Sequence, residues 1–151
     1  GHRLTLEEIV KEFPYLLPGL VVHPGVGFVM IHSSQMGAVT LGKKGRMYLS
    51  TGVVEGENPL KDYSPVTQQN LMRTDSFPNA PDILVMSTYW KDNDEVAAFE
   101  EQVASHGGTG GEQSKPFILY PSEFQLGTDG IIGAEAVYKV FKRWTDEVQK
   151  A

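Results

Sequence analysis

The fold is decided by residues 27–54, which read GFVMIHSSQMGAVTLGKKGRMYLSTGVV. Short segments of apolar and β-branched residues alternate in this stretch with polar turns that contain glycine. The segments lie at 27–32, 38–41, 46–50 and 53–54. Short strands with glycine turns at this spacing are typical of an antiparallel hairpin or meander. We therefore expect an antiparallel meander in the N-terminal half of the chain.

Helices are expected on either side of this meander. Thr5 and Glu8 have the spacing of a capping box, which predicts a short helix that ends at Pro14. The Pro-Gly dipeptide at 18–19 then predicts a turn that leads into residues 20–22. The Ser-Pro dipeptide at 64–65 predicts a second helix, because serine caps helices and proline is tolerated in the first turn.

The C-terminal half carries further strand and helix signals. Residues 82–87 form a continuous apolar run, which is typical of a strand buried on both faces. Asp94 as a cap predicts a third helix over 95–104. Three elements are then expected in order: a glycine-rich loop at 105–111, a second buried strand at 116–120 and an amphipathic helix at 132–150.

These signals together predict the fold class and the domain organisation. The predicted class is α/β, with a layered sheet covered by helices and an N-terminal antiparallel hairpin or meander. The length and the 40% of hydrophobic residues suit one domain with a real core, so we expect residues 1–151 to form a single domain.

Composition excludes several classes of function. No run of about eighteen apolar residues occurs, so no membrane span is expected. The net charge of −6 argues against binding of duplex nucleic acid, which needs a basic face. The chain has no cysteine, which excludes disulfides and thiolate zinc sites and suits a reducing compartment. No signal peptide is visible, and a cytoplasmic location is favoured.

The candidate for chemistry is His106, within Ser-His-Gly-Gly-Thr-Gly-Gly at 105–111. A neutral imidazole is the commonest metal ligand among side chains, and Gly107 and Gly108 allow the backbone to pass close to a ligand. The alternative is structural, with Gly107 as a helix C-cap and the rest as a loop. The loop is no Walker-type phosphate cradle, and the chain has no GxSxG elbow and no short-range pair of metal ligands, so no catalytic residue is assigned.

Several segments resemble a known family. They are RTDSFP at 73–78, PDILV at 81–85, DEVAAFEE at 94–101 and SHGG at 105–108, together with HPGVGF at 23–28. The chain, over roughly residues 4–144, resembles the C-terminal part of bacterial proteins of the type I phosphodiesterase/nucleotide pyrophosphatase group of the alkaline phosphatase superfamily. Only the SHGG segment corresponds to catalytic machinery in that group.

The resemblance implies a two-metal phosphoester hydrolase with an α/β/α sandwich, of which this chain is a portion. His106 matches a late metal ligand of such enzymes, and the ions are zinc or manganese. The nucleophile, the first aspartate and an Asp-His pair have no counterpart here and would belong to a missing N-terminal part. We therefore expect the isolated chain to be inactive and to hold no metal tightly. Its expected partners are that N-terminal part, a phosphoester substrate of the parent enzyme and a second copy of the chain.

A second function remains open from the residues alone. Because the other ligands are absent, the chain also fits a non-catalytic module that binds a partner or serves a structural role. The two hypotheses differ in the metal binding that they predict: the hydrolase hypothesis predicts that the parent protein binds zinc or manganese tightly, and the second hypothesis does not.

Overall fold

The computed structural model describes residues 2–101, 108–127 and 130–150. The chain divides into two compact units, residues 1–116 and residues 117–151, and each is described by itself. Helices and strands both occur, so the α/β class predicted from the sequence is confirmed. The expectation that the whole chain belongs to one domain of a larger hydrolase stays a prediction.

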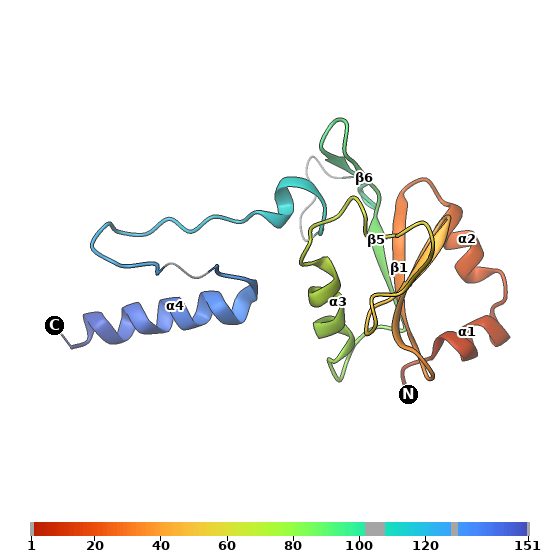
Figure 1. The fold of residues 1–151 in the computed structure, drawn as a ribbon, viewed down its shortest axis with the longest axis horizontal. Coiled ribbons are helices and arrows are strands. Elements are labelled where there is room, and N and C mark those ends of the chain that lie inside the picture. The colour runs from red at the N-terminus through yellow and green to blue at the C-terminus, as the bar shows by residue number, and fades with distance from the viewer. Residues whose placement is uncertain (1, 102–107, 128–129, 151) are drawn as a thin grey trace. The chain divides into compact units, whose positions relative to one another are not determined.

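A five-stranded antiparallel sheet forms the centre of the first unit (Figure 1). Its strands are β1 (Val26–Ser33), β2 (Gly37–Gly42), β3 (Gly45–Tyr48), β4 (Val54–Gly56) and β5 (Ile83–Ser87). They lie in the order β4-β3-β2-β1-β5, and each neighbouring pair runs antiparallel. Strands β1 to β4 are the meander that the glycine turns predict.

Helices cover both faces of this sheet (Figure 1). Strand β1 is apolar on both sides, because successive side chains of a strand point to opposite faces. Phe28 and Met30 pack with Leu71 of helix α3 (Thr67–Asp75), while Val29 and Ile31 pack on the side of helices α1 (Leu6–Glu12) and α2 (Leu16–Val22). These four β1 residues are fully buried, so β1 lies at the centre of the core.

At the N-terminus, the predicted capping box of the first helix is confirmed and the predicted turn at residues 18–19 is wrong. Helix α1 begins with the predicted capping box, in which the Thr5 hydroxyl accepts from the backbone N–H of Glu8. Residues 18–19 do not form the expected turn, because helix α2 runs through them. Pro18 lies in the first helical turn, where its missing N–H would have no helical partner in any case. Leu17 is buried against the sheet, and this packing stabilises the helix.

Strand β5 forms where a buried strand is expected, but it lies at an edge of the sheet. It pairs only with β1, and all five of its residues are partly buried rather than fully buried. Leu84 and Met86 contact the core on the side of α3, and Ile83 and Val85 contact the core on the opposite side. The side chains of β5 are apolar because both of its faces contact the core, although only one of its edges pairs with another strand.

The helix expected over 95–104 is wrong for its described part. Glu95–Val96 forms strand β7, which pairs with β6 (Tyr89–Trp90) in a hairpin. Asp94 has a φ of 54°, a left-handed conformation that does not suit a helix cap. Its carboxylate accepts a hydrogen bond of 2.9 Å from the Tyr89 hydroxyl. The polar residues that resemble a helix start are thus the turn of a hairpin.

The second unit is built around helix α4 (Gly133–Val148), which confirms the predicted C-terminal helix. Trp144 of α4 is buried, stacks on Tyr120 and Phe124, and donates from its indole N–H to the Gln125 carbonyl. Residues 116–120 do not form the expected strand, and the described part of the second unit contains no strand for them to pair with. Among the described residues, no helix combines the length and the apolar character needed to cross a membrane.

Candidate functional site

The predicted metal ligand His106 and its neighbour Gly107 lie outside the described residues. Gly108 is described, and its backbone N–H donates to the Gln113 side-chain oxygen at 3.0 Å. The next carbonyl, of Thr109, accepts from the backbone N–H of Ser64 at 3.1 Å. The glycine-rich loop is therefore attached to the folded first unit on the C-terminal side of His106.

The last glycines of this loop pass directly over the ring of Tyr89. A Cβ atom added at Gly110 would come within 2.7 Å of Tyr89, and one at Gly111 would come within 2.8 Å of the same ring. Gly111 also has a φ of +57°, which favours glycine. Glycine is thus needed here for the close approach of the loop to Tyr89.

The other histidines contribute to local structure. His23 accepts from the backbone N–H of Gly25 through Nδ1 at 3.1 Å, within the turn between α2 and β1. His32 pairs through Nδ1 with the Asp75 carboxylate at 2.9 Å. Asp75 also binds the Arg3 guanidinium at 2.8 Å, so this network joins the N-terminus, β1 and α3. No group of three or more metal-ligating side chains occurs within the described residues.

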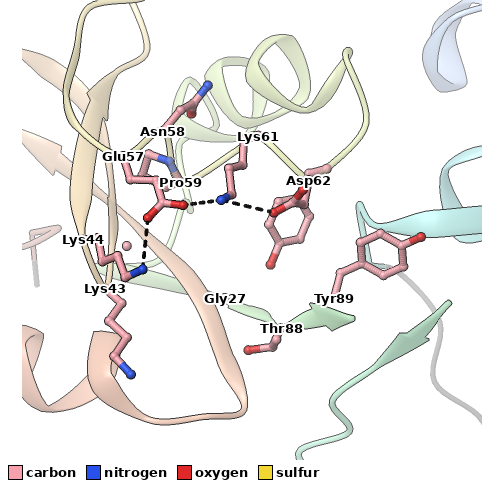
Figure 2. A pocket seen from close by; sticks show the side chains of 12 residues that line it. Gly27, Lys43, Lys44, Glu57, Asn58, Pro59, Lys61, Asp62, Thr88 and Tyr89 are labelled. Atoms are coloured by element: carbon pink, nitrogen blue, oxygen red, sulfur yellow. Dashed lines mark hydrogen bonds and ion pairs between the residues drawn. The ribbon is translucent and has the colours of Figure 1, made fainter. Parts of the chain in front are cut away.

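A pocket of about 260 Å³ lies beside Tyr89 (Figure 2). Its wall comes from segments far apart in the sequence: residues 27, 42–44, 57–59, 61–63 and 88–89. The start of β1, the β2–β3 turn, the loop after β4 and the end of β5 thus meet around one cavity. This convergence of distant segments makes the pocket a candidate site.

Two glycines allow the loop after β4 to close over the sheet. A Cβ atom at Gly27 would overlap the Tyr63 hydroxyl, at a distance of only 1.8 Å. A Cβ atom at Gly42 would approach Pro59 at 3.1 Å, which is tighter than ordinary contact. Tyr63 fills the space over Gly27, packs edge-on against Phe28 and donates to the Ser87 carbonyl at 2.8 Å. The pocket floor is therefore a packed part of the core.

Three lysines and two carboxylates surround the cavity. Figure 2 shows the Glu57 carboxylate between the ammonium groups of Lys44 and Lys61, and Lys61 also lies 3.9 Å from Asp62. The hydrogen bond from Lys61, with the charges of both lysines, lowers the pKa of Glu57, and the same bond raises the pKa of Lys61. Lys43 has no carboxylate partner within the described part of the chain.

Two tyrosines form the apolar side of the pocket. Burial raises the pKa of Tyr63 to about 12, so its phenol stays protonated at neutral pH. The hydrogen bond to Asp94 raises the pKa of Tyr89. Both phenols are therefore neutral at neutral pH.

The pocket residues carry no contiguous signal of a site in the sequence. Residues 42–45 read Gly-Lys-Lys-Gly, which is typical of a tight turn, and residues 55–63 have the composition of a polar loop. The fold and the pocket define a mixed α/β protein with helices on both faces of an antiparallel sheet. No family model, no curated protein and no solved structure matches the chain.

Proposed function

We propose that this chain is the C-terminal segment of a metal-dependent phosphodiesterase or nucleotide pyrophosphatase-like hydrolase, and that His106 is one of its metal ligands. The observation that carries the proposal is the solvent exposure of apolar side chains in residues 116–120, which read PFILY. Phe117 is 89% exposed and Leu119 is 92% exposed. The segment has the composition of a buried strand, and the described part of its own unit contains no strand that would pair with it.

Exposure of these side chains within the second unit favours a covering surface outside that unit. Burial of one phenylalanine or leucine side chain stabilises a protein by about 1.5–3 kcal/mol, so two in one short segment are costly to leave in water. Helix α4 shows the same feature on its apolar stripe, where Phe141 is 47% exposed and Val148 is 61% exposed. A sheet in the rest of the parent enzyme would cover such surfaces.

The resemblance supplies the chemistry of the proposal. A pair of zinc or manganese ions would stabilise the attacking and leaving oxygens of a phosphoryl transfer. His106 would supply one imidazole ligand, and Gly107 and Gly108 would let the backbone approach the ion. The nucleophile and the remaining ligands would come from the N-terminal part, which makes the isolated chain inactive.

The test is metal binding measured by calorimetry on this chain and on the longer parent protein. We expect tight zinc or manganese binding only in the parent and its loss in His106→Ala. The control is His23→Ala, since His23 serves a turn and should leave metal affinity within about twofold. Equal metal affinity and equal phosphodiesterase activity in both variants would contradict the ligand assignment.

A second candidate function is a non-catalytic partner-binding module. The favouring observation is a set of exposed apolar side chains on and between α1 and α2, with Tyr15 at 86% and Val22 at 57% exposure. Failure of the parent protein to bind either metal would favour this module. A parent sequence without a Thr or Ser nucleophile and an Asp-His pair would favour it as well.

A further inference from the structure

The pocket of Figure 2 presents an excess of positive charge in a chain whose net charge is −6. Lys44 and Lys61 share the single carboxylate of Glu57, and only Lys61 also reaches Asp62. Lys43 adds a third ammonium that has no carboxylate partner in the described residues. The internal ion pairs therefore leave one positive charge without compensation at the cavity.

The pocket also has more free hydrogen-bond donors on its lysines than acceptors that pair with them. The hydroxyl groups of Tyr63, Thr88 and Tyr89 already donate to Ser87, Pro24 and Asp94 respectively. Each ammonium carries three N–H groups, and the contacts with Glu57 and Asp62 use only some of them.

Asn58 adds to these donors. Its side-chain oxygen accepts from Leu60, which leaves both amide hydrogens for another partner. The groups that remain around the cavity are therefore mainly donors, and a ligand that satisfies them has to supply several acceptor oxygens.

The geometry points to a phosphoryl group, and we propose that this pocket binds a phosphate ester or pyrophosphate. A phosphoryl group offers three strong acceptor oxygens and a charge close to two, which suits three ammonium groups better than a carboxylate does. The volume of about 260 Å³ is slightly below that of pockets for drug-sized ligands, roughly 300–1,000 Å³, and suits a small anionic group.

This inference rests on the proposed function and deepens it. A phosphoester hydrolase has to hold a part of its substrate that does not react, and such contacts orient the reacting group. Tyr89 lines the pocket and also lies under Gly110 and Gly111, so the site adjoins the described end of the loop that carries His106. The lysine pocket would hold a non-reacting phosphoryl group of the substrate.

The experiment is titration of this chain with inorganic pyrophosphate in buffer freed of divalent metal. We expect saturable binding, and we expect the double variant Lys43→Gln/Lys44→Gln to weaken it at least tenfold. The matched control is Lys139→Gln/Lys142→Gln, which removes the same charge from α4 and should change affinity less than threefold. Circular dichroism checks folding, and Lys43→Gln alone serves if the double variant does not fold.

Each outcome bears on the proposal directly. Absence of saturable binding, equal binding by the pocket variant and the control variant, or equal binding of malonate, a dicarboxylate of similar charge, would overturn it. His106→Ala should keep its affinity for pyrophosphate, because the pocket uses other residues. Loss of metal binding in His106→Ala of the parent protein, with no pyrophosphate site in the wild-type chain, would refute the pocket and leave the metal-ligand assignment standing.

Discussion

The substitution Leu119→Ala distinguishes two hypotheses: that the chain is a fragment of a larger enzyme, or that it is a self-sufficient module. In the isolated chain the Leu119 side chain is 92% exposed, so its truncation removes almost no packing. Substitutions at such surface positions change stability by no more than about 0.5 kcal/mol. In the parent enzyme, the proposed function requires residues 116–120 to be a buried strand. Truncation of a buried leucine to alanine costs about 2–5 kcal/mol, because it removes contacts and leaves a cavity.

The measurement is amide hydrogen exchange of residues 116–120, read by mass spectrometry in both proteins. The isolated chain has no strand pairing in this segment, so exchange should be fast with or without the substitution. In the parent, a loss of about 2 kcal/mol would speed exchange of this segment roughly thirtyfold, since about 1.4 kcal/mol corresponds to a factor of ten.

Leu60→Ala is the control, because Leu60 is 8% exposed and packs in the core beside α3. It should speed exchange of β1 to a similar degree in both proteins, which shows that both respond to loss of core packing. Fast exchange of residues 116–120 in the parent, unaffected by Leu119→Ala, would refute the reasoning and leave the segment exposed and unpaired in the parent as well.

Two further predictions concern the stability of the first unit. Hydrogen bonds from two serine hydroxyls and one backbone N–H hold the pKa of Glu7 at about 2, below its ordinary value of 4.5. The carboxylate therefore stabilises the fold fully above about pH 5, and this contribution, about 1–2 kcal/mol after allowance for solvent, is lost as the pH falls towards 2. The free energy of unfolding, measured by urea titration at several pH values, should fall less for Glu7→Gln than for the wild type as the pH drops from about 5 to about 2. The control variant Glu12→Gln, which changes an exposed residue, should follow the wild type. Asp75→Ala should cost about 1–3 kcal/mol, because it leaves the partly buried Arg3 and His32 without their shared carboxylate. An unchanged thermal midpoint for Asp75→Ala would show that the network adds nothing to stability.

Much of the fold follows from local sequence signals. The glycine turns between 37 and 52 predict the meander, because short strands joined by tight turns pair with their neighbours in sequence. The capping box at Thr5 and Glu8 predicts α1, since its hydrogen bonds lie within one helical turn. The apolar stripe of residues 132–150 likewise predicts α4.

Other elements depend on contacts that local signals do not contain. Residues 95–96 have the composition of a helix start, yet pairing with residues 89–90 makes them a strand. The Pro-Gly dipeptide at 18–19 lies inside α2, because burial of Leu17 against the sheet outweighs the local preference for a turn. Residues 116–120 carry the signal of a strand, but a strand forms only where another strand supplies hydrogen bonds.

Of the two candidate functional features, one follows from the sequence and the other only from the tertiary structure. His106 is identified from the sequence, because the residues that point to it are contiguous in the chain at 105–108. The pocket is visible only in the tertiary structure, because residues 42–44 and 57–63 lie on separate loops that line one cavity, with Tyr63 packed over Gly27. The sequence by itself determined the meander, the two terminal helices and one metal-ligand candidate, since these depend on residues close together in the chain. Only the tertiary structure decided which distant charges share a cavity, because that depends on how the loops pack against the sheet.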